Sequence, residues 1–393
     1  MTRLSPPATP RPRRSVFFRV TGRYHAGRVA AFAAAVAGAT VISAAGEDRP
    51  GADRGPAVAY APPPAGAVPG VPVLPPIQAP LDVNARTLRV GPGGDYATPS
   101  AAAAAAKDGD TIEIAPGDYR ADVAVWNAHR LRIVGGEPRP RIFADGRDAQ
   151  GKGIWVVRGD DTTIEHVDLS GAKVPDRNGA AIRVEGRNFT LRRAYLHDNE
   201  NGLLTGANAT SEITIDRCEF ARNGGGEGLT HNVYVGNVAK LTVTESWLHH
   251  AIGGHNLKSR AMTTVVTDSR LADEGDGRAS YEADFSNGGR VTLAFNIFQK
   301  AATAENGTLV SYGAEGLAGN TAHALSIKGN TFVSQRPDGA RFLFIAPGTD
   351  AVAITGNVFA GPGSLPDVPR IRANNAVQKQ LPGNVDLKPE GLR

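Results

Sequence analysis

One six-residue pattern recurs eight times in the body of the chain and restricts the folds that the chain can adopt. Each copy has an apolar residue, two variable residues, a small or amide residue, one variable residue and an apolar residue, and successive copies start 23 to 34 residues apart. The copies are residues 164–169, 191–196, 215–220, 243–248, 266–271, 293–298, 327–332 and 354–359. We interpret each copy as one strand. No helix-length periodic segment separates the copies, so the pattern predicts a coil of parallel strands, a β-helix.

The fourth position of the pattern tests this interpretation. Along the chain it holds Val167, Ala194, Cys218, Ser246, Ser269, Asn296, Asn330 and Asn357. Equivalent residues on consecutive turns of a β-helix lie about 4.8 Å apart, which allows stacked amides to hydrogen-bond to one another. We therefore expect an interior asparagine ladder. Cys218, the one cysteine of the chain, is expected to fill a small core position in this column rather than act as a reactive thiol.

The start of the body has the composition of a cap. Residues 99–107 (PSAAAAAAK) predict a short helix with Ser100 as its N-cap, and a cap protects the open strand edge at the end of a coil. The following DGDTIEIAPGDY, residues 108–119, resembles the opening of many pectin-lyase-like β-helix proteins. This resemblance covers about residues 86–362 and implies an all-β, right-handed single-stranded parallel β-helix with a short N-terminal capping helix.

The residues before the body differ from it in composition. Residues 1–45 contain seven arginines and no acidic residue, and residues 29–45 are apolar and end in small side chains. This is the layout of a signal peptide, or of a signal anchor if it is not cleaved, and Arg13-Arg14 resembles a twin-arginine export motif. We therefore expect a secreted or periplasmic protein. Residues 46–84 predict a Pro/Ala-rich linker, residues 85–375 the β-helix domain, and residues 376–393 a C-terminal tail.

The net charge of +4 is a property of the leader. Without residues 1–45 the chain has 36 basic and 39 acidic residues, so a global attraction for nucleic acid is not implied. We expect no nucleic-acid partner, a membrane contact only if the leader is an uncleaved anchor, and a monomer. An anionic polysaccharide would have to be bound by a local patch.

Each turn contains a second strand, and its outward positions gather reactive side chains. Because strand residues alternate between faces, we expect Tyr234, Lys258 and the pair Glu282/Asp284 to point outward on adjacent turns. His231 and His255 lie where two of these strands begin. The residues that we expect to bind substrate on the same face are Arg183, Asn232, Asn256, Ser311 and Tyr312.

These residue types suit proton abstraction next to a carboxylate. Cleavage of a uronic-acid polymer by β-elimination removes the C5 proton of the sugar, and a cation on the carboxylate stabilises the transition state. We predict that Arg260 holds the carboxylate, that Lys258 takes the proton because a neighbouring cation lowers its pKa, and that Tyr234, His231 or His255 protonates the leaving oxygen.

Resemblances support this hypothesis in part. A Lys and Arg pair on a β-helix face is similar to that of chondroitinase- and alginate-type lyases, in which Ca²⁺ assists, and residues 255–261 (HNLKSRA) resemble a recurring element of bacterial β-helix proteins. The Asp-rich motifs of polygalacturonase-type hydrolases and the Arg-x-Pro-x-x-Arg pattern of classical pectate lyases are absent from the sequence.

Other interpretations of the same residues stay open. Glu282 and Asp284 could pair with Lys258 and Arg260 as surface ion bridges, or they could bind Ca²⁺, the one candidate cofactor. His231, His249, His250 and His255 could bind a transition metal, although no ligand spacing supports it. A polysaccharide lyase is the leading hypothesis. A C5 epimerase, a glycoside hydrolase and a non-catalytic carbohydrate-binding or surface protein are the alternatives.

Overall fold

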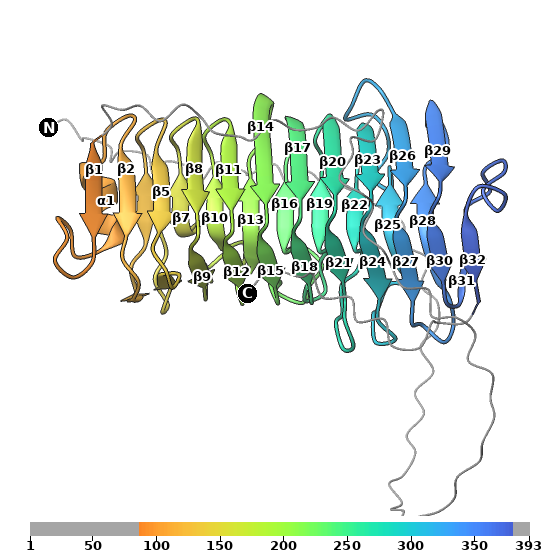
Figure 1. Ribbon diagram of the computed structural model, residues 1–393, viewed down its shortest axis with the longest axis horizontal. Coiled ribbons are helices and arrows are strands. Elements are labelled where there is room, and N and C mark those ends of the chain that lie inside the picture. The colour runs from red at the N-terminus through yellow and green to blue at the C-terminus, as the bar shows by residue number, and fades with distance from the viewer. Residues whose placement is uncertain (1–85, 380–393) are drawn as a thin grey trace, which may run out of the picture. The chain divides into compact units, whose positions relative to one another are not determined.

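The computed structural model describes residues 86–379, which belong to one compact unit and wind into a coil of three parallel sheets (Figure 1). Every pairing between neighbouring strands within a sheet is parallel, and consecutive strands of a sheet come from consecutive turns of the coil. Apart from one short helix, the described elements are all strands. The all-β, right-handed parallel β-helix predicted from the sequence is confirmed.

The strands of each sheet follow one another along the axis of the coil. Sheet A contains β1 (Thr87–Val90), β2 (Thr111–Ile114), β5 (Arg132–Gly135), β8 (Thr162–Glu165), β11 (Phe189–Arg192), β14 (Asn208–Asp216), β17 (Val238–Thr244), β20 (Thr263–Thr267), β23 (Arg290–Ala294), β26 (Ala324–Lys328) and β29 (Ala351–Thr355). Sheet B contains β3 (Asp118–Arg120), β6 (Arg141–Phe143), β9 (Asp168–Ser170), β12 (Tyr195–His197), β15 (Glu219–Ala221), β18 (Trp247–His249), β21 (Arg270–Ala272), β24 (Ile297–Lys300), β27 (Thr331–Ser334), β30 (Val358–Ala360) and β32 (Ala376–Gln378). Sheet C contains β4 (Ala124–Trp126), β7 (Gly153–Val157), β10 (Ala180–Val184), β13 (Asn201–Thr205), β16 (Val233–Val235), β19 (Leu257–Ser259), β22 (Ala283–Phe285), β25 (Thr308–Tyr312), β28 (Ala340–Ile345) and β31 (Gly363–Ser364).

The six-residue pattern is a corner and not a single strand, which corrects the sequence-based interpretation. Its first two residues end a strand of sheet A, and its last two belong to the following strand of sheet B. The third residue has a positive φ in every copy, for example 59° at His166 and 47° at Arg193, with glycine only at Gly329 and Gly356. This left-handed residue redirects the chain, so each full turn has three strands and not two.

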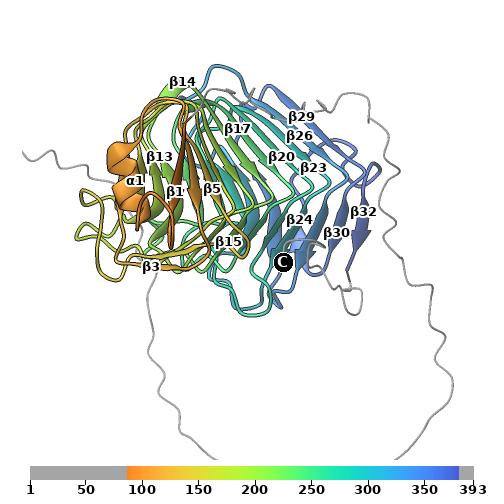
Figure 2. The same cartoon turned by 60° about the vertical axis from the view of Figure 1, so that its left-hand side comes forward.

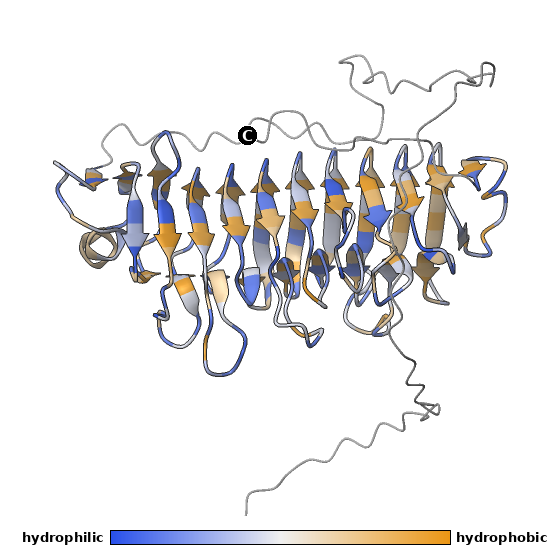
Figure 3. Cartoon of the chain, turned by 90° about the horizontal axis from the view of Figure 1, so that it is seen from below, coloured by the Kyte–Doolittle hydropathy of each residue, from blue (hydrophilic) through white to orange (hydrophobic). Residues whose placement is uncertain are grey.

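The interior of the coil is apolar, with polar ladders at its corners. Apolar residues align from strand to strand across the sheets (Figure 3). All eight residues at the fourth position are buried. The Nδ2 of Asn296 donates to Asn330 Oδ1 at 3.0 Å and that of Asn330 to Asn357 Oδ1 at 3.0 Å. The predicted ladder is therefore present, and Asn357 extends it to Asn375 at 2.8 Å. Burial raises the pKa of Cys218 to about 12, in keeping with its predicted core position.

The short helix α1 (Pro99–Ala105) lies at the N-terminal end of the coil, where it packs against β1 and β4 (Figure 2). It buries Pro99, Ala102 and Ala103 and contacts β4, the terminal strand of sheet C, which is the edge that a cap must cover. The N-cap is Thr98, whose side chain accepts a hydrogen bond from Ala101 N. Ser100 was expected there, but it lies inside the helix, where its hydroxyl hydrogen-bonds to Asp122.

The leader, the linker and most of the C-terminal tail predicted from the sequence lie outside the described residues. Between Arg86 and Lys379 the structure contains no helix with the length and hydrophobicity needed to cross a membrane.

The asparagine ladder makes a testable contribution to stability. Asn330 donates to Leu293 O and accepts from Asn296 N, and both groups are buried. Asn330→Ala should lower the free energy of unfolding by about 2 kcal/mol or more, because two buried backbone groups each lose a partner, at a cost of about 1–3 kcal/mol apiece. Chemical denaturation of Asn330→Ala and of Ser326→Ala, an exposed position on β26, checks this. Equal midpoints in the two variants would contradict the role of the ladder.

Candidate functional site

The outward face of sheet C brings the central sequence-predicted residues together on three turns. Tyr234 on β16, Lys258 on β19 and Asp284 on β22 are aligned in register, and Ser311 on β25 follows Asp284. The residues three positions earlier, His231, His255 and Tyr281, form a second row on the same turns. Equivalent residues of neighbouring strands are about 4.8 Å apart. One sugar ring is of similar length, so side chains from adjacent turns can contact a single sugar residue.

Lys258 and Arg260 share one carboxylate. Lys258 Nζ lies 2.7 Å from Glu315 Oε1, and Arg260 Nη2 lies 2.5 Å from Glu315 Oε2. Arg260 also donates from Nε to Tyr234 Oη at 2.9 Å and from Nη1 to Asn287 Oδ1 at 2.5 Å. Lys258 Nζ lies 5.5 Å from the centre of the Tyr234 ring, within the range of a cation–π contact. We name these five residues, Tyr234, Lys258, Arg260, Asn287 and Glu315, the cationic cluster.

Glu315 offsets part of the positive charge of the cationic cluster. Burial raises the pKa of Glu315, but hydrogen bonds and charge from Lys258 and Arg260 outweigh it and bring the pKa below its usual value. Burial likewise opposes the charge on Arg260, while the bonds to Glu315 and Tyr234 raise the pKa of Arg260 above its usual value. Glu315 is therefore a carboxylate and Arg260 a guanidinium over the whole neutral range.

His231 and His255 are neutral rings stacked at 4.5 Å. Burial, followed by the charge of Lys258, lowers the pKa of His231 to about 3. Burial also holds the pKa of His255 well below its usual value, and the charge of a protonated His231 is the next largest cause. His255 N donates to His231 Nδ1 at 3.0 Å, so the ring proton of His231 must be on Nε2. His231 is thus fixed as a neutral hydrogen-bond donor.

Asp284 lies beneath the cationic cluster and is almost fully buried. Its Oδ2 accepts a hydrogen bond from Ser286 Oγ at 2.5 Å and lies 3.9 Å from Lys258 Nζ and 3.8 Å from His255 Nε2. Burial raises the pKa of Asp284, although Ser286 and Lys258 oppose the shift. Asp284 and Glu315 therefore flank Lys258 with opposite pKa shifts.

Three residues that we expected on the outward face lie inside the coil. Asn232, Asn256 and Glu282 are fully buried. Each precedes the first residue of its strand, in the corner between sheets B and C, where the alternation of a strand does not hold. The expected outward position of Glu282 beside Asp284 is therefore wrong, as is the expected outward position of Asn232 and Asn256.

These buried residues belong to a chain of side-chain hydrogen bonds that runs in one direction. Asn199 donates to Asn223 at 2.9 Å, Asn223 to Asn232 at 2.7 Å, Asn232 to Asn256 at 2.6 Å, and Asn256 to Glu282 at 2.6 Å. Lys300 Nζ lies 2.7 Å from the other oxygen of Glu282. Burial, and then the charge of Asp273, raises the pKa of Glu282 well above its usual value, against the effect of Lys300. We name this set the inner amide chain.

The inner amide chain fixes the outward residues next to it. His231, His255 and Tyr281 each immediately precede one of its members on the same three turns. Because the three members are tied to one another, the neighbouring rings are held at a constant spacing. This explains why the rings stack along the axis of the coil, at 4.5 Å for His231 and His255 and at 4.8 Å for His255 and Tyr281.

Two further predicted substrate-binding residues lie apart from the cationic cluster. Arg183 is in register with Leu204, and Leu204 is in register with Tyr234. Arg183 therefore lies on the outward face two turns before Tyr234. Tyr312 is fully buried, and its hydroxyl donates to Gly289 O at 2.6 Å. Burial raises its pKa to about 12. Tyr312 therefore points to the core and not outward as expected, whereas its neighbour Ser311 is in register with Asp284.

The metal sites considered from the sequence find no support in the described residues. Within residues 86–379, no group of three or more His, Cys, Asp and Glu side chains is arranged to hold a metal ion. Glu282 is paired with Lys300 inside the coil, so it cannot share a Ca²⁺ ion with Asp284 on the outer side. His249 and His250 contact each other and hydrogen-bond to Glu219 and Asp276, on and beside sheet B, away from the stacked pair.

Sequence reasoning missed two members of the cationic cluster, Glu315 and Asn287. Both lie in loops and not in strands. The one signal in the sequence that points to Glu315 is the longest spacing between copies of the pattern, the 34 residues from Leu293 to Ile327, because an insertion in a coil maps to a loop on its surface.

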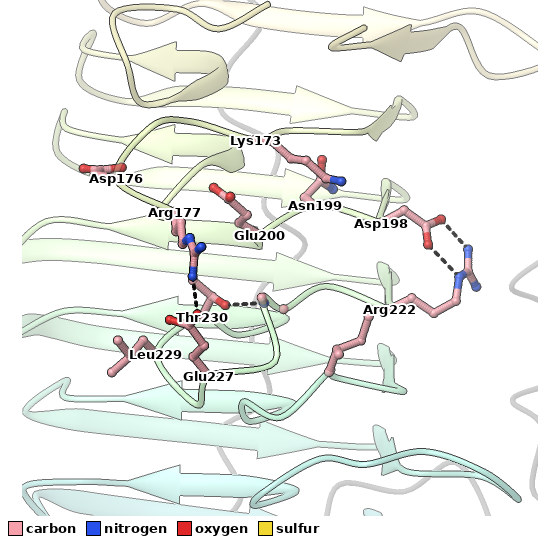
Figure 4. Close-up of a pocket in the computed structure, with 13 residues that line it drawn as sticks. Lys173, Asp176, Arg177, Asp198, Asn199, Glu200, Arg222, Glu227, Leu229 and Thr230 are labelled. Carbon is pink, nitrogen blue, oxygen red and sulfur yellow. Dashed lines mark hydrogen bonds and ion pairs between the residues drawn. The ribbon is translucent and has the colours of Figure 1, made fainter. Parts of the chain in front are cut away.

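A pocket of about 530 Å³ opens near the beginning of β16 (Figure 4). It is lined by loops of four successive turns, and Thr230, which precedes His231, lies at its edge. Asp198 pairs with Arg222, and Arg177 with Glu227, as Figure 4 shows. None of the site residues predicted from the sequence lines this pocket. The chemistry is assigned to the cationic cluster because it contains three of the predicted catalytic residues, Tyr234, Lys258 and Arg260, whereas the pocket contains none.

The neutral state of His231 predicts a loss of stability in acid. Its folded-state pKa of about 3 lies below the ordinary 6.5, so its contribution is complete above pH 6.5 and is lost as the pH falls toward 3. A difference of one between the folded and unfolded pKa values corresponds to about 1.4 kcal/mol of stability. Between pH 6 and 4, His231→Asn should therefore lose less unfolding free energy than the wild type, by about 1.4 kcal/mol per pH unit, measured by urea denaturation.

His129 supplies a matched control for this measurement. Its Nδ1 also accepts a backbone hydrogen bond, from Asp160 N at 3.0 Å, but its side chain is 47% exposed. His129→Asn should leave the pH dependence of the wild type unchanged. If His231→Asn and the wild type gave parallel curves, His231 would not be a buried neutral ring.

The chain is similar to known proteins in the path of its backbone and not in its sequence. No protein-family model and no curated protein sequence matches it. Similar solved structures include pectate lyase Pel9A, with 12% identity, a TM-score of 0.47 and coverage of 75% of this chain and 78% of that one. A second is the PL6 family alginate lyase AlyGC, with 16% identity, a TM-score of 0.41 and coverage of 80% of this chain and 42% of that one. A third is the GH136 lacto-N-biosidase from Eubacterium ramulus, with 13% identity, a TM-score of 0.37 and coverage of 70% of this chain and 68% of that one. On the evidence of its own three parallel sheets, the described part of the chain is a parallel β-helix.

Proposed function

We propose that the protein is a lyase that cleaves a uronic-acid-containing polysaccharide by β-elimination, with the cationic cluster as its active site. The observation that carries this proposal is the carboxylate of Glu315, held between Lys258 Nζ at 2.7 Å and Arg260 Nη2 at 2.5 Å. A pair of cations that binds this carboxylate has the geometry to bind the carboxylate of a sugar.

The substrate carboxylate would take the place of Glu315. Arg260 is positioned for it because Tyr234 and Asn287 hold its Nε and Nη1, which leaves Nη2 directed at the carboxylate. A charge-assisted bond to an arginine is stronger than a neutral one and fixes the orientation of the acid group. The C5–H bond of the bound sugar, next to the carboxylate, then lies close to Lys258 and Tyr234.

The elimination uses groups of this cluster. Once Glu315 is displaced, Lys258 Nζ gives a proton to solvent, and the resulting neutral amine takes the C5 proton while Arg260 neutralises the charge that develops on the carboxylate. The electron pair of the C5–H bond forms the C4–C5 double bond, the C4–O bond breaks, and the leaving oxygen receives the proton of Tyr234. Because Arg260 donates to Tyr234 Oη, the phenol keeps its own proton available for transfer. The products are an unsaturated uronate and a new reducing end.

The stacked histidines support this reaction without titrating in the neutral range. The neutral His231 offers Nε2–H as a donor to a sugar hydroxyl or to the leaving oxygen. A charged imidazolium on the same face would compete with Arg260 for the substrate carboxylate. Burial of both rings removes this competition.

A second candidate is a glycoside hydrolase that uses Asp284 and Glu315. Both carboxylates lie near Lys258 Nζ, at 3.9 Å and 2.7 Å, which places them within the several-ångström separation that hydrolases use. Their pKa values are shifted in opposite directions, as expected for an acid and a base. Glu282, which is two residues before Asp284, does not belong to this pair because it is buried inside the coil.

The cellular location belongs to the same proposal. The Arg-rich leader and the apolar residues 29–45 support export, and an exported enzyme would meet polysaccharide outside the cytoplasm. We propose a secreted or periplasmic monomer that acts on an anionic polysaccharide.

A panel of uronic-acid polymers tests the reaction. The wild type should release products with the ultraviolet absorbance of a C4–C5 unsaturated uronate from at least one polymer. Lys258→Ala and Tyr234→Phe should each lower kcat by about 10²–10⁴-fold, the usual contribution of a general base or acid, with a smaller change in KM. Arg260→Ala should both raise KM and lower kcat, because Arg260 binds the carboxylate and neutralises the charge that develops on it.

Lys152→Ala is the control, since Lys152 is ion-paired with Glu185 elsewhere on the coil, and it should keep full activity. New reducing ends without unsaturation would favour the hydrolase, and exchange of the C5 hydrogen with solvent without cleavage would favour an epimerase. Polymer binding with no chemical change in any of the polymers would overturn the lyase.

A further inference from the structure

A strap of eight residues, 313–320, runs along the C-terminal ends of the sheet C strands, beside the cationic cluster. It leaves β25 at Gly313, whose N donates to Phe285 O at 2.9 Å, and turns sharply at Gly316, where φ is 90°. Glu315 N donates to Ser286 O at 3.0 Å. Farther along, Gly319 O accepts from Asn237 Nδ2 at 3.1 Å, across 82 residues of sequence. The strap therefore runs back toward the N-terminal end of the coil, from β25 to the turn that contains β16.

Leu317 anchors the strap on a surface made of glycines. A Cβ placed on Gly288 would come within 2.8 Å of Leu317 Cδ2, and one on Gly313 within 2.7 Å. Any side chain at these two positions would collide with Leu317, so the two glycines form the surface, here called its seat, on which the Leu317 side chain packs. Leu317 is the partly buried apolar contact of the strap with the core.

Glu315 is the polar anchor, and it covers the cations. Its side chain is 43% exposed, whereas that of Lys258 is 12% and that of Arg260 is 25% exposed. Most residues of the strap are exposed, among them Ala314, Glu315, Gly316, Ala318 and Gly319. A segment with few buried contacts opens at low cost compared with the strands beneath it.

We propose that the strap is a cover that closes the cationic cluster when no ligand is bound, with Glu315 occupying the position of a ligand carboxylate. An anionic sugar binds by displacing Glu315 from Lys258 and Arg260, and the strap then swings away about Gly313, with Leu317 leaving its seat. The identity of the ligand as a uronate rests on the proposed function, whereas the cover itself rests on the contacts of Glu315 and Leu317.

The cover has a consequence for affinity. Only molecules with an open strap expose both cations, so the apparent affinity is reduced by the fraction of closed molecules. Weakening either anchor raises the open fraction. It should therefore tighten the binding of a carboxylate ligand, although no group that contacts the ligand is changed.

Hydrogen–deuterium exchange of the full chain tests the opening. Glu315→Gln and Leu317→Ala should each accelerate exchange of the amides in residues 313–320 at least fivefold, with no change in β19 and β22. Glu305→Gln is the matched control, because Glu305 is an exposed glutamate in the neighbouring loop between β24 and β25. It should exchange as the wild type does.

Calorimetric titration tests the displacement. Sodium oligogalacturonate and sodium oligomannuronate serve as probes, and their methyl esters as uncharged counterparts. Glu315→Gln and Leu317→Ala should each lower the Kd of the acid that binds by about tenfold, and neither should affect the ester. Addition of the acid to the wild type should increase exchange in residues 313–320.

The outcomes separate the cover from the proposed function. If neither acid binds any variant but both substitutions accelerate exchange in the strap, the uronate ligand is wrong and the cover stands. If the acid binds with the same Kd and the strap exchanges equally in wild type, Glu315→Gln and Leu317→Ala, the cover is wrong and the site is permanently open to ligand. If only Glu315→Gln loses activity while binding is unchanged, Glu315 is a catalytic carboxylate and not a cover.

Discussion

The rest of the structure depends on the in-register stacking of parallel turns, because it places each side chain directly above the equivalent one of the preceding turn. A polar group inside such a coil has its neighbours along the axis as the natural partners. The interior can therefore contain amides only as continuous chains. Two such chains occur in the described residues, the ladder from Asn296 to Asn375 and the inner amide chain from Asn199 to Lys300.

The inner amide chain links this constraint to the site. It ends at the carboxylate of Glu282 and the ammonium of Lys300, both fully buried. A buried charge without its partner is costly, so the geometry of this corner is fixed by the pair at its end. His231, His255 and Tyr281 lie immediately outside, and Tyr234, Lys258 and Asp284 follow three residues later on each strand. The strands thus provide a rigid row of side chains, and the strap is the component that we propose to move.

The sequence predicts the parts of this arrangement that repeat. The coil, the interior column with Cys218 and the asparagine ladder all follow from residues that recur at one position of the pattern. The corners do not follow, because the left-handed third residue is His, Arg, Glu, Asp or Phe in six of the eight copies and carries no signal. Glu282 was misplaced because alternation was extended past the first residue of β22. The recurrence of Asn232 and Asn256 at one position, the same sign that revealed the ladder, could have shown that this column is interior. Glu315 could not be placed, since a contact across 57 residues between Lys258 and a loop leaves no periodic trace.

The measurement that tests the account most directly is the crystal structure of Tyr234→Phe with an oligouronate bound. The account predicts a sugar carboxylate within hydrogen-bonding distance of Arg260 and Lys258, with Glu315 displaced and the C5 atom of the sugar facing Lys258 Nζ. An oligosaccharide bound instead in the pocket beside Thr230, with Glu315 still on Lys258 and Arg260, would contradict it.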